Sequence, residues 1–170
     1  ADTQVAIVFT SGSTGEPVGH AKSWGGLVTR GVARRALLDP DPEPACLVGT
    51  VPPYHLYGFE AVVIQCLATR VTAMTGPGRY PADWRHQLRQ TPTPGILVTT
   101  PLQLGSLVRS GLALPPIRRV VSASAPLDTE QAMAAETVLA TEVTEIYGTT
   151  ETGSVATRRT LDGPRWELCE

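Results

Sequence analysis

The stretch GILVTTPLQLGSLVRSGLALPPIRRVVSAS, residues 95–124, contains one complete strand–helix–strand unit. Its first and last segments, GILVTT and RRVVSAS, are short apolar runs rich in β-branched residues, which is typical of buried strands. Between them, PLQLGSLVRSG begins with proline and spaces its leucines as a helix does. We therefore predict a strand, a helix and a second strand in this order.

The same alternation extends over most of the chain. The predicted strands are QVAIVFT (4–10), ACLVGTV (45–51), RVTAM (70–74), GILVTT (95–100), RRVVSAS (118–124) and EVTEIYG (142–148). The predicted helices occupy 23–38, 57–69, 81–90, 101–111 and 128–141. In the last helix, Asp128 is placed to cap the N-terminus and Gln131 to complete a capping box. Because the strands are apolar without strict alternation, we predict an α/β fold, a mostly parallel β-sheet with helices on both faces.

Composition narrows the classes of function. The chain has 170 residues, 42% of them hydrophobic, and a formal net charge of −2, so we expect one core and no nucleic-acid partner. No apolar run approaches the length of a membrane span and no signal-peptide pattern opens the sequence, so we expect no membrane span and a cytoplasmic location. Three scattered cysteines and three scattered histidines indicate free thiols and no metal centre built from these residues.

In parallel α/β sheets, ligands bind where loops leave the carboxyl ends of the strands. The segment FTSGSTGEPVGHAKSW, residues 9–24, is such a loop, and its Thr10–Gly15 part offers four hydroxyl groups and successive backbone N–H groups. Such donors can surround a phosphate chain, and Lys22 can add a positive charge. The spacing fits neither GxxxxGK[ST] nor GxGxxG, and no GxSxG elbow is present. A solvated Ser/Gly linker remains the alternative reading.

Four signatures in order extend the interpretation. TSGSTGEP resembles the [ST]SG[ST]TGxPK phosphate loop of the adenylate-forming superfamily, which contains acyl- and aryl-CoA synthetases and adenylation domains. PPYHLYG resembles the family's PxxHxxG stretch, SASAPL its SGGAPL turn, and IYGTTE its YGxTE signature. Taken singly, the histidine could be a loop residue bonded to backbone and SASAPL a simple turn. As an ordered set, they identify the chain as similar to this family over Phe9–Glu151.

The resemblance implies a role for each matching residue. Phosphate binding is implied for Thr10, Ser11, Gly12, Ser13, Thr14, Gly15 and Lys22. Adenine contacts are implied for Ser124, Ala125, Pro126, Tyr147, Gly148 and Thr149. His55 and Gly58 would shape the acyl pocket, Thr150 would bind the α-phosphate, and Glu151 would carry magnesium. The implied catalytic residues are thus His55, Thr150 and Glu151, and the implied cofactors are ATP and Mg²⁺.

Two departures from the family pattern matter. Val18 stands where the family has lysine, and Lys22 follows four positions later, so we expect Lys22 to reach back to the phosphates from the start of the next helix. Ala123 and Ser124 replace the two glycines of SGGAPL. The variant EPVGHAKSWG, with VPPYHLYGFE, is similar to the AMP-ligases of aryl polyene and xanthomonadin pigment assembly.

The leading hypothesis is an acid–thiol ligase. The resemblance implies ATP-dependent activation of a carboxylic acid, aromatic or of medium length, as an acyl-adenylate, with transfer to a thiol of CoA or an acyl carrier protein. We expect residues 1–170 to form a single AMP-binding subdomain of such an enzyme's large N-terminal domain, with upstream and C-terminal parts missing and little turnover in isolation. A non-catalytic nucleotide-binding module and a plain structural α/β domain are the alternatives.

Overall fold

The computed structural model describes residues 2–10, 16–38, 44–74 and 78–169. Its strands are β1 (Gln4–Thr10), β2 (Val18–Ser23), β3 (Ala45–Gly49), β4 (Val71–Ala73), β5 (Gly95–Thr99), β6 (Ile117–Ser122), β7 (Val143–Thr149), β8 (Gly153–Arg159) and β9 (Glu167–Leu168). Its α-helices are α1 (Trp24–Leu38), α2 (Leu56–Gly58), α3 (Gln65–Ala68), α4 (Pro81–Gln90), α5 (Pro101–Arg109) and α6 (Thr129–Leu139). A π-helix, η1 (Phe59–Ile64), joins α2 to α3, and a 3₁₀ turn, η2 (Thr160–Asp162), follows β8.

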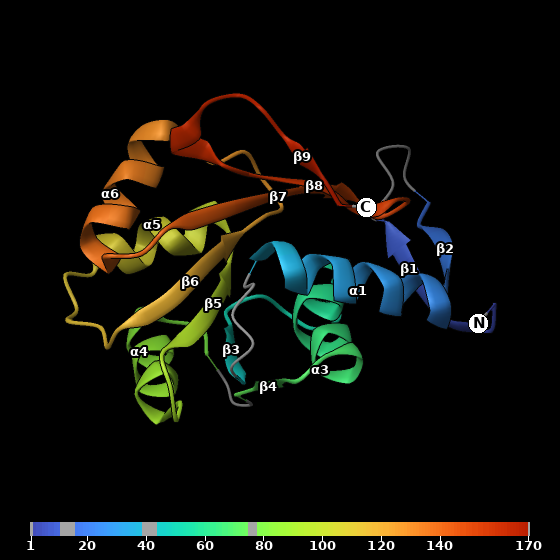
Figure 1. The fold of residues 1–170 in the computed structure, drawn as a ribbon, viewed down its shortest axis with the longest axis horizontal. Helices are drawn as coiled ribbons and strands as arrows, with labels where there is room; N and C mark the ends of the chain where they lie inside the picture. The colour runs from blue at the N-terminus through green and yellow to red at the C-terminus, as the bar shows by residue number, and fades with distance from the viewer. Residues whose placement is uncertain (1, 11–15, 39–43, 75–77, 170) are drawn as a thin grey trace.

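A seven-stranded sheet forms the centre of the molecule, in the order β4-β3-β5-β6-β7-β8-β9 (Figure 1). The first five strands are parallel, and β8 and β9 are added antiparallel at one edge. The prediction of a mostly parallel sheet is confirmed. Parallel pairing brings the carboxyl ends of β3, β5, β6 and β7 to the same edge, which is where the predicted site loops begin.

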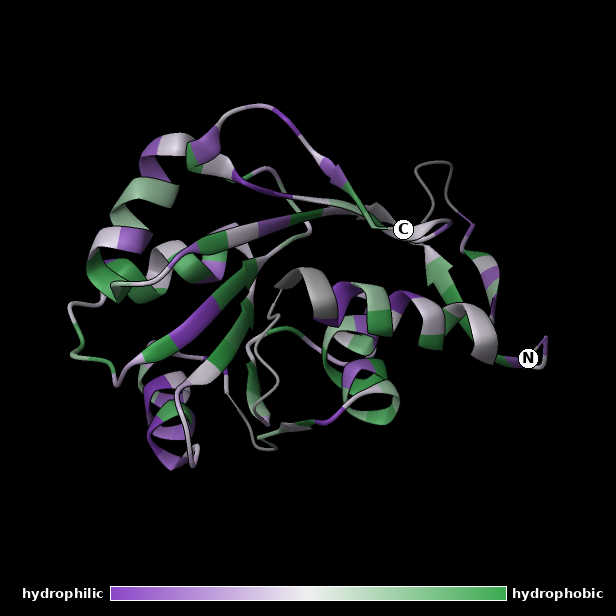
Figure 2. Ribbon diagram, viewed as in Figure 1, coloured by the Kyte–Doolittle hydropathy of each residue, from purple (hydrophilic) through white to green (hydrophobic). Residues whose placement is uncertain are grey.

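Helices cover both faces of this sheet, as predicted. Neighbouring residues on a strand point to opposite faces, so Leu97 packs in the core beneath α4, α5 and α6, whereas Ile96 and Val98 pack on the face covered by η1 and α3. Strands buried on both faces need apolar residues at successive positions, which explains the green strands in Figure 2. Helix α1 lies against η1 and α3, where Gly31 allows it to approach Ala68 closely.

Strand β1 differs from the prediction. It pairs antiparallel with β2 in a separate two-stranded sheet and takes no place in the parallel sheet. The reason is local: residues 18–23, expected to be loop and helix start, are extended and offer β1 a partner without a crossover helix. One face of β1, with Val5, Ile7 and Phe9, is exposed, while Ala6 and Val8 point inward.

At the N-terminus of α6, the predicted cap by Asp128 is confirmed and the predicted capping box is not. The Asp128 carboxylate accepts hydrogen bonds from the backbone N–H groups of Glu130, at 2.8 Å, and Gln131, at 3.1 Å. The Gln131 side chain does not complete the capping box, because its amide donates to the carbonyl oxygen of Pro101. This amide links α6 to the start of α5.

Candidate active-site cleft

A cleft of about 500 Å³ opens at the carboxyl edge of the parallel sheet. It lies between the inner side of the β1–β2 sheet, the loop after β3, the loop after β6, and the β7–β8 turn. Its lining residues are Val8, Phe9, Val51, Pro52, His55, Leu56, Tyr57, Gly58, Glu60, Thr100, Ala123, Ser124, Ile146, Gly148, Thr149, Thr150, Gly153 and Ser154. Residues from three of the four signatures therefore meet at one cavity.

The loop after β3 brings His55 and Gly58 into this cleft. His55 is the N-cap residue of α2, and its carbonyl oxygen accepts a hydrogen bond from Phe59 at 2.8 Å. Gly58 has no space for a side chain, since an added Cβ would lie 2.2 Å from the carbonyl oxygen of Pro52. The glycine of this signature is thus required by a close backbone approach. It folds the loop so that the His55 imidazole lies at the cleft.

The loop after β6 presents Ser124 to the cleft. Its φ of 77° lies in the left-handed region that glycine adopts without strain. Ser124 replaces a glycine of the SGGAPL pattern. The backbone nevertheless keeps the conformation that a glycine would adopt there. Ala125 and Pro126 continue the loop toward α6 at the exposed surface and are absent from the lining of the described cleft.

The β7–β8 turn carries the last signature. Gly148 lies against Gly153, and a Cβ on Gly148 would be 2.3 Å from the Gly153 carbonyl oxygen. The hydroxyl groups of Thr149 and Thr152 are 3.0 Å apart, and each also accepts from the other residue's backbone N–H at 3.3 Å. These bonds keep the turn compact. Thr150 lines the cleft as a result.

Glu151 stands at the rim of the cleft with 56% of its side chain exposed. The pKa of its carboxyl is held below the usual range by a hydrogen bond from the Thr149 side chain first, by a backbone hydrogen bond next, and by the nearby Lys22 ammonium to a smaller extent. The imidazole Nε2 of His20 lies 3.6 Å from Glu151 Oε1. At neutral pH this carboxylate is ionised and available to a cation.

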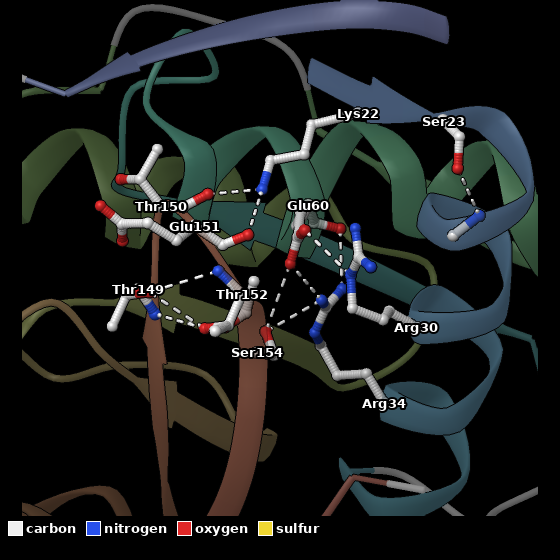
Figure 3. A network of polar contacts seen from close by, with 12 residues as sticks. Lys22, Ser23, Arg30, Arg34, Glu60, Thr149, Thr150, Glu151, Thr152 and Ser154 are labelled. Atoms are coloured by element: carbon white, nitrogen blue, oxygen red, sulfur yellow. Dashed lines mark hydrogen bonds and ion pairs between the residues drawn. The ribbon is translucent and has the colours of Figure 1, made fainter. Parts of the chain in front are cut away.

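Lys22 is on strand β2, so the expectation that it lies at a helix start is wrong. Only 5% of its surface is exposed, and its ammonium donates to the carbonyl oxygens of Thr150 and Glu151, the latter at 3.1 Å (Figure 3). Burial lowers the pKa of Lys22 and the nearby Arg30 lowers it further, while Glu60 and Glu151 oppose the shift. The lysine therefore contacts the predicted phosphate and metal residues through their main chain.

Tyr147 precedes the turn and points away from the buried Ile146, because successive strand residues face opposite sides. More than half of Tyr147 is exposed, and its ring lies 5.8 Å from the Trp166 ring, tilted by 58°. The Arg158 guanidinium covers Trp166 at 4.4 Å. Tyr147 thus belongs to an exposed aromatic cluster, and it is absent from the residues that line the described cleft.

A buried charge network at the wall of the cleft was not predicted from the sequence. Glu60, in η1, accepts from Arg34 Nη2 at 2.8 Å and from Arg30 Nε at 3.3 Å, and Ser154 of β8 donates to it at 3.4 Å (Figure 3). Gly153, with φ 75°, has no space for a Cβ beside these groups. The network ties α1 and η1 to the β7–β8 hairpin. A charged residue within the apolar run FEAVVI was the available signal.

Other predicted residues lie apart from the cleft or outside the described part of the chain. Thr10 closes strand β1, where its hydroxyl donates to the Val18 carbonyl at 3.4 Å. The core of the predicted phosphate loop, residues 11–15, lies outside the described residues. Within the described ranges, no helix has the length and apolarity to cross a membrane.

The structure is an α/β domain with a cleft at the carboxyl edge of its parallel sheet, the edge at which such sheets bind ligands. Residues 1–168 match the family described as "AMP-binding enzyme", and the chain therefore belongs to that family. It is 31% identical over 162 residues to a 4-coumarate–CoA ligase of Rhodobacter capsulatus, a match covering 93% of this chain and 40% of the relative. The chain thus spans about two fifths of that relative's length.

Solved structures share the fold. The inhibitor-bound N-terminal domain of FACL13 from Mycobacterium tuberculosis has a TM-score of 0.81 at 20% identity, covering 95% of this chain and 41% of that one. ATP-bound MatB from Rhodopseudomonas palustris has a TM-score of 0.80 at 24% identity, covering 97% and 33%. The α/β fold of the large N-terminal domain of adenylate-forming enzymes, predicted from the sequence, is confirmed.

Proposed function

We propose that this chain is the nucleotide-binding part of an ATP- and Mg²⁺-dependent ligase that activates a carboxylic acid as an acyl-adenylate. The acid would then pass to a thiol of CoA or of an acyl carrier protein. Membership of the AMP-binding family supports this class of reaction, and the relative named 4-coumarate–CoA ligase supports CoA as acceptor. Because the chain spans only part of that relative, the activity belongs to the complete enzyme.

One observation carries the proposal: His55, Ser124, Thr149 and Thr150 come from three separate loops and line the same cleft. Adenylate formation needs a carboxylate, an α-phosphate and a metal held in line, and positioning supplies most of the rate acceleration. The Thr150 hydroxyl can donate to a phosphoryl oxygen from the cleft wall. No acid–base pair is needed, because the acid enters as its carboxylate.

Magnesium fits the residues at the rim. Mg²⁺ binds through one or two carboxylates together with substrate phosphates and retained waters. Glu151 offers one exposed carboxylate whose pKa is lowered, next to the cleft-lining Thr150. The described residues contain no cluster of three metal-ligating side chains, so a site of this shared kind is the one that fits. Bound there, the cation would supply neutralisation of phosphate charge.

The apolar part of the cleft lining favours an apolar acid. Val8, Val51, Leu56, Tyr57 and Ile146 belong to the lining, together with His55. We propose an aromatic or medium-length acyl group, because burying its apolar surface against these side chains makes the free energy of binding more favourable. The pigment-assembly branch and a cytoplasmic location stay predictions from the sequence.

Carboxylate-dependent exchange of labelled pyrophosphate into ATP tests the proposal in the complete enzyme. Thr150→Ala and Glu151→Ala should each lower exchange at least tenfold, since each removes a group aligned on the phosphates or the metal. Glu142→Ala removes an exposed carboxylate at the far end of β7 and serves as the charge-matched control. Exchange that survives both site substitutions would contradict the site assignment.

A non-catalytic nucleotide-binding module is the second candidate. Val18 in place of the family lysine and Ser124 in place of a family glycine favour it, because both are departures within signatures that the resemblance assigns to the nucleotide. Such a module would bind ATP, measured by calorimetry, without any pyrophosphate exchange across a panel of aryl and alkyl acids. A purely structural domain would show no ATP affinity at all.

A further inference from the structure

The inner face of the β1–β2 sheet bears two ionisable residues aimed at the β7–β8 turn. His20 and Lys22 are two residues apart in β2 and so share a face. They are paired with Val8 and Ala6 of β1, whose side chains also point inward. The hairpin therefore turns an imidazole and an ammonium toward the cleft rim.

Lys22 holds the main chain of the turn. Its ammonium donates to the carbonyl oxygens of two consecutive residues, Thr150 and Glu151, which lie 128 and 129 positions further along the chain. Two acceptors on successive peptide units restrain both the position and the direction of this segment. The side chains of Thr150 and Glu151 extend from the restrained backbone.

His20 faces the carboxylate of the same segment. Its Nε2 atom is shielded from solvent and has no hydrogen-bond partner among the described residues, yet it lies 3.6 Å from Glu151 Oε1. A buried polar atom without a partner carries a free-energy cost. A small movement of the Glu151 carboxylate would let it accept a hydrogen bond from an Nε2–H of His20.

We propose that His20 and Lys22 are positioning residues that hold Thr150 and Glu151 in place from strand β2 before any nucleotide binds. For its effect on catalysis this inference rests on the proposed function; for its effect on the turn it does not. The lysine absent at Val18 is thus not replaced by a direct phosphate ligand. Lys22 acts through the main chain of the residues that contact phosphate and metal.

Amide hydrogen exchange measured without nucleotide tests the positioning role directly. In Lys22→Met the amides of residues 147–154 should exchange about tenfold faster or more, because two hydrogen bonds to a charged donor are lost. The amides of β5 and β6 should keep their rates. Arg70→Met, the same loss of charge at the opposite edge of the sheet, should change neither set. Lys22→Gln, which keeps one donor group, should fall between wild type and Lys22→Met.

Unchanged exchange in residues 147–154 of both Lys22 variants would overturn the inference. So would equal acceleration in β5 and β6, because that indicates general destabilisation rather than local positioning. His20→Ala should raise the Mg²⁺ concentration for half-maximal ATP binding several-fold without changing exchange in β5 or β6. If wild type binds no ATP, the proposed function fails while the exchange data still decide the positioning role.

Lys22 is the sole lysine of the sequence, which gives a second readout. An acylating reagent followed by mass spectrometry reports on this one ε-amine. We expect slow labelling without nucleotide and no further slowing on addition of Mg²⁺–ATP. An ε-amine that labels rapidly and becomes protected only by ATP would identify a direct phosphate ligand and overturn the inference.

Discussion

Nη2 of Arg34 lies 2.8 Å from Oε2 of Glu60, and the two side chains expose only 1% and 3% of their surfaces. The pair joins α1 to the π-helix η1, and Glu60 lines the cleft. Ser154 of β8 completes it by accepting from Arg34 at 3.0 Å. Short π-helical segments within helices are frequent at functional sites. Here η1 places the Glu60 carboxylate against Ser154 of the β7–β8 hairpin.

Glu60→Gln should lower the free energy of unfolding by about 3–5 kcal/mol, since it leaves the buried Arg34 guanidinium without a counter-charge. Urea denaturation followed by circular dichroism measures the loss. Arg119→Met breaks the exposed pair of Arg119 with Glu142 and should cost less than about 1 kcal/mol. Equal costs for the two variants would show that the buried pair contributes no more than a surface one.

Gly148→Ala should destabilise the hairpin by about 1–3 kcal/mol, because the new methyl group would meet the Gly153 backbone and force it to move. Gly111→Ala is the control: Gly111 has φ 64° but nothing within 4 Å of an added Cβ, so only backbone strain of about 1 kcal/mol applies. Thermal unfolding compares the two. ATP affinity should fall in Gly148→Ala only, and a fall in both variants would argue against a local effect.

Tyr147→Ala should weaken ATP binding about 5- to 150-fold, since stacking of a base on an aromatic ring contributes about 1–3 kcal/mol. Tyr147→Phe keeps the ring and should bind nearly as wild type does. Isothermal titration calorimetry of the complete enzyme provides both affinities. Loss of binding in Tyr147→Phe would instead point to the phenol hydroxyl.

Glu136 of α6 gives a prediction for pH. Burial tends to raise its pKa, but hydrogen bonds from Arg159 and from the Val143 N–H outweigh this, and the pKa is lowered from 4.5. A carboxyl with a lowered pKa in the folded state stabilises the protein above its unfolded-state pKa. That stability is lost as the pH falls through the folded-state pKa.

Wild type should therefore lose more unfolding free energy than Glu136→Gln as the pH falls from about 6 through the unfolded-state value of 4.5 toward the lowered pKa. Urea unfolding at each pH measures it. In an Arg159→Met background the same substitution should have a smaller effect, because the main hydrogen-bond donor is gone. Parallel pH profiles for wild type and Glu136→Gln would refute the assignment.

Local sequence patterns determined much of the fold. Each predicted strand and each predicted helix lies within a few residues of an observed one, because apolar periodicity depends on near neighbours along the chain. The signatures also placed glycine where the fold requires it, since Gly58 and Gly148 occupy positions where no side chain fits. The family signatures likewise indicated which loops would form the cleft.

Tertiary structure alone decided how these elements meet. Strand β1 lies outside the parallel sheet because it pairs with the extended segment Val18–Ser23. The apolar periodicity of a strand does not determine which other strand it pairs with. Lys22 donates to the carbonyl oxygens of Thr150 and Glu151, and Glu60 pairs with Arg34. Both contacts join residues far apart in the sequence, so they form only when separate elements pack together. The sequence thus indicated which loops meet at the cleft, and packing between distant segments decided which of their residues touch.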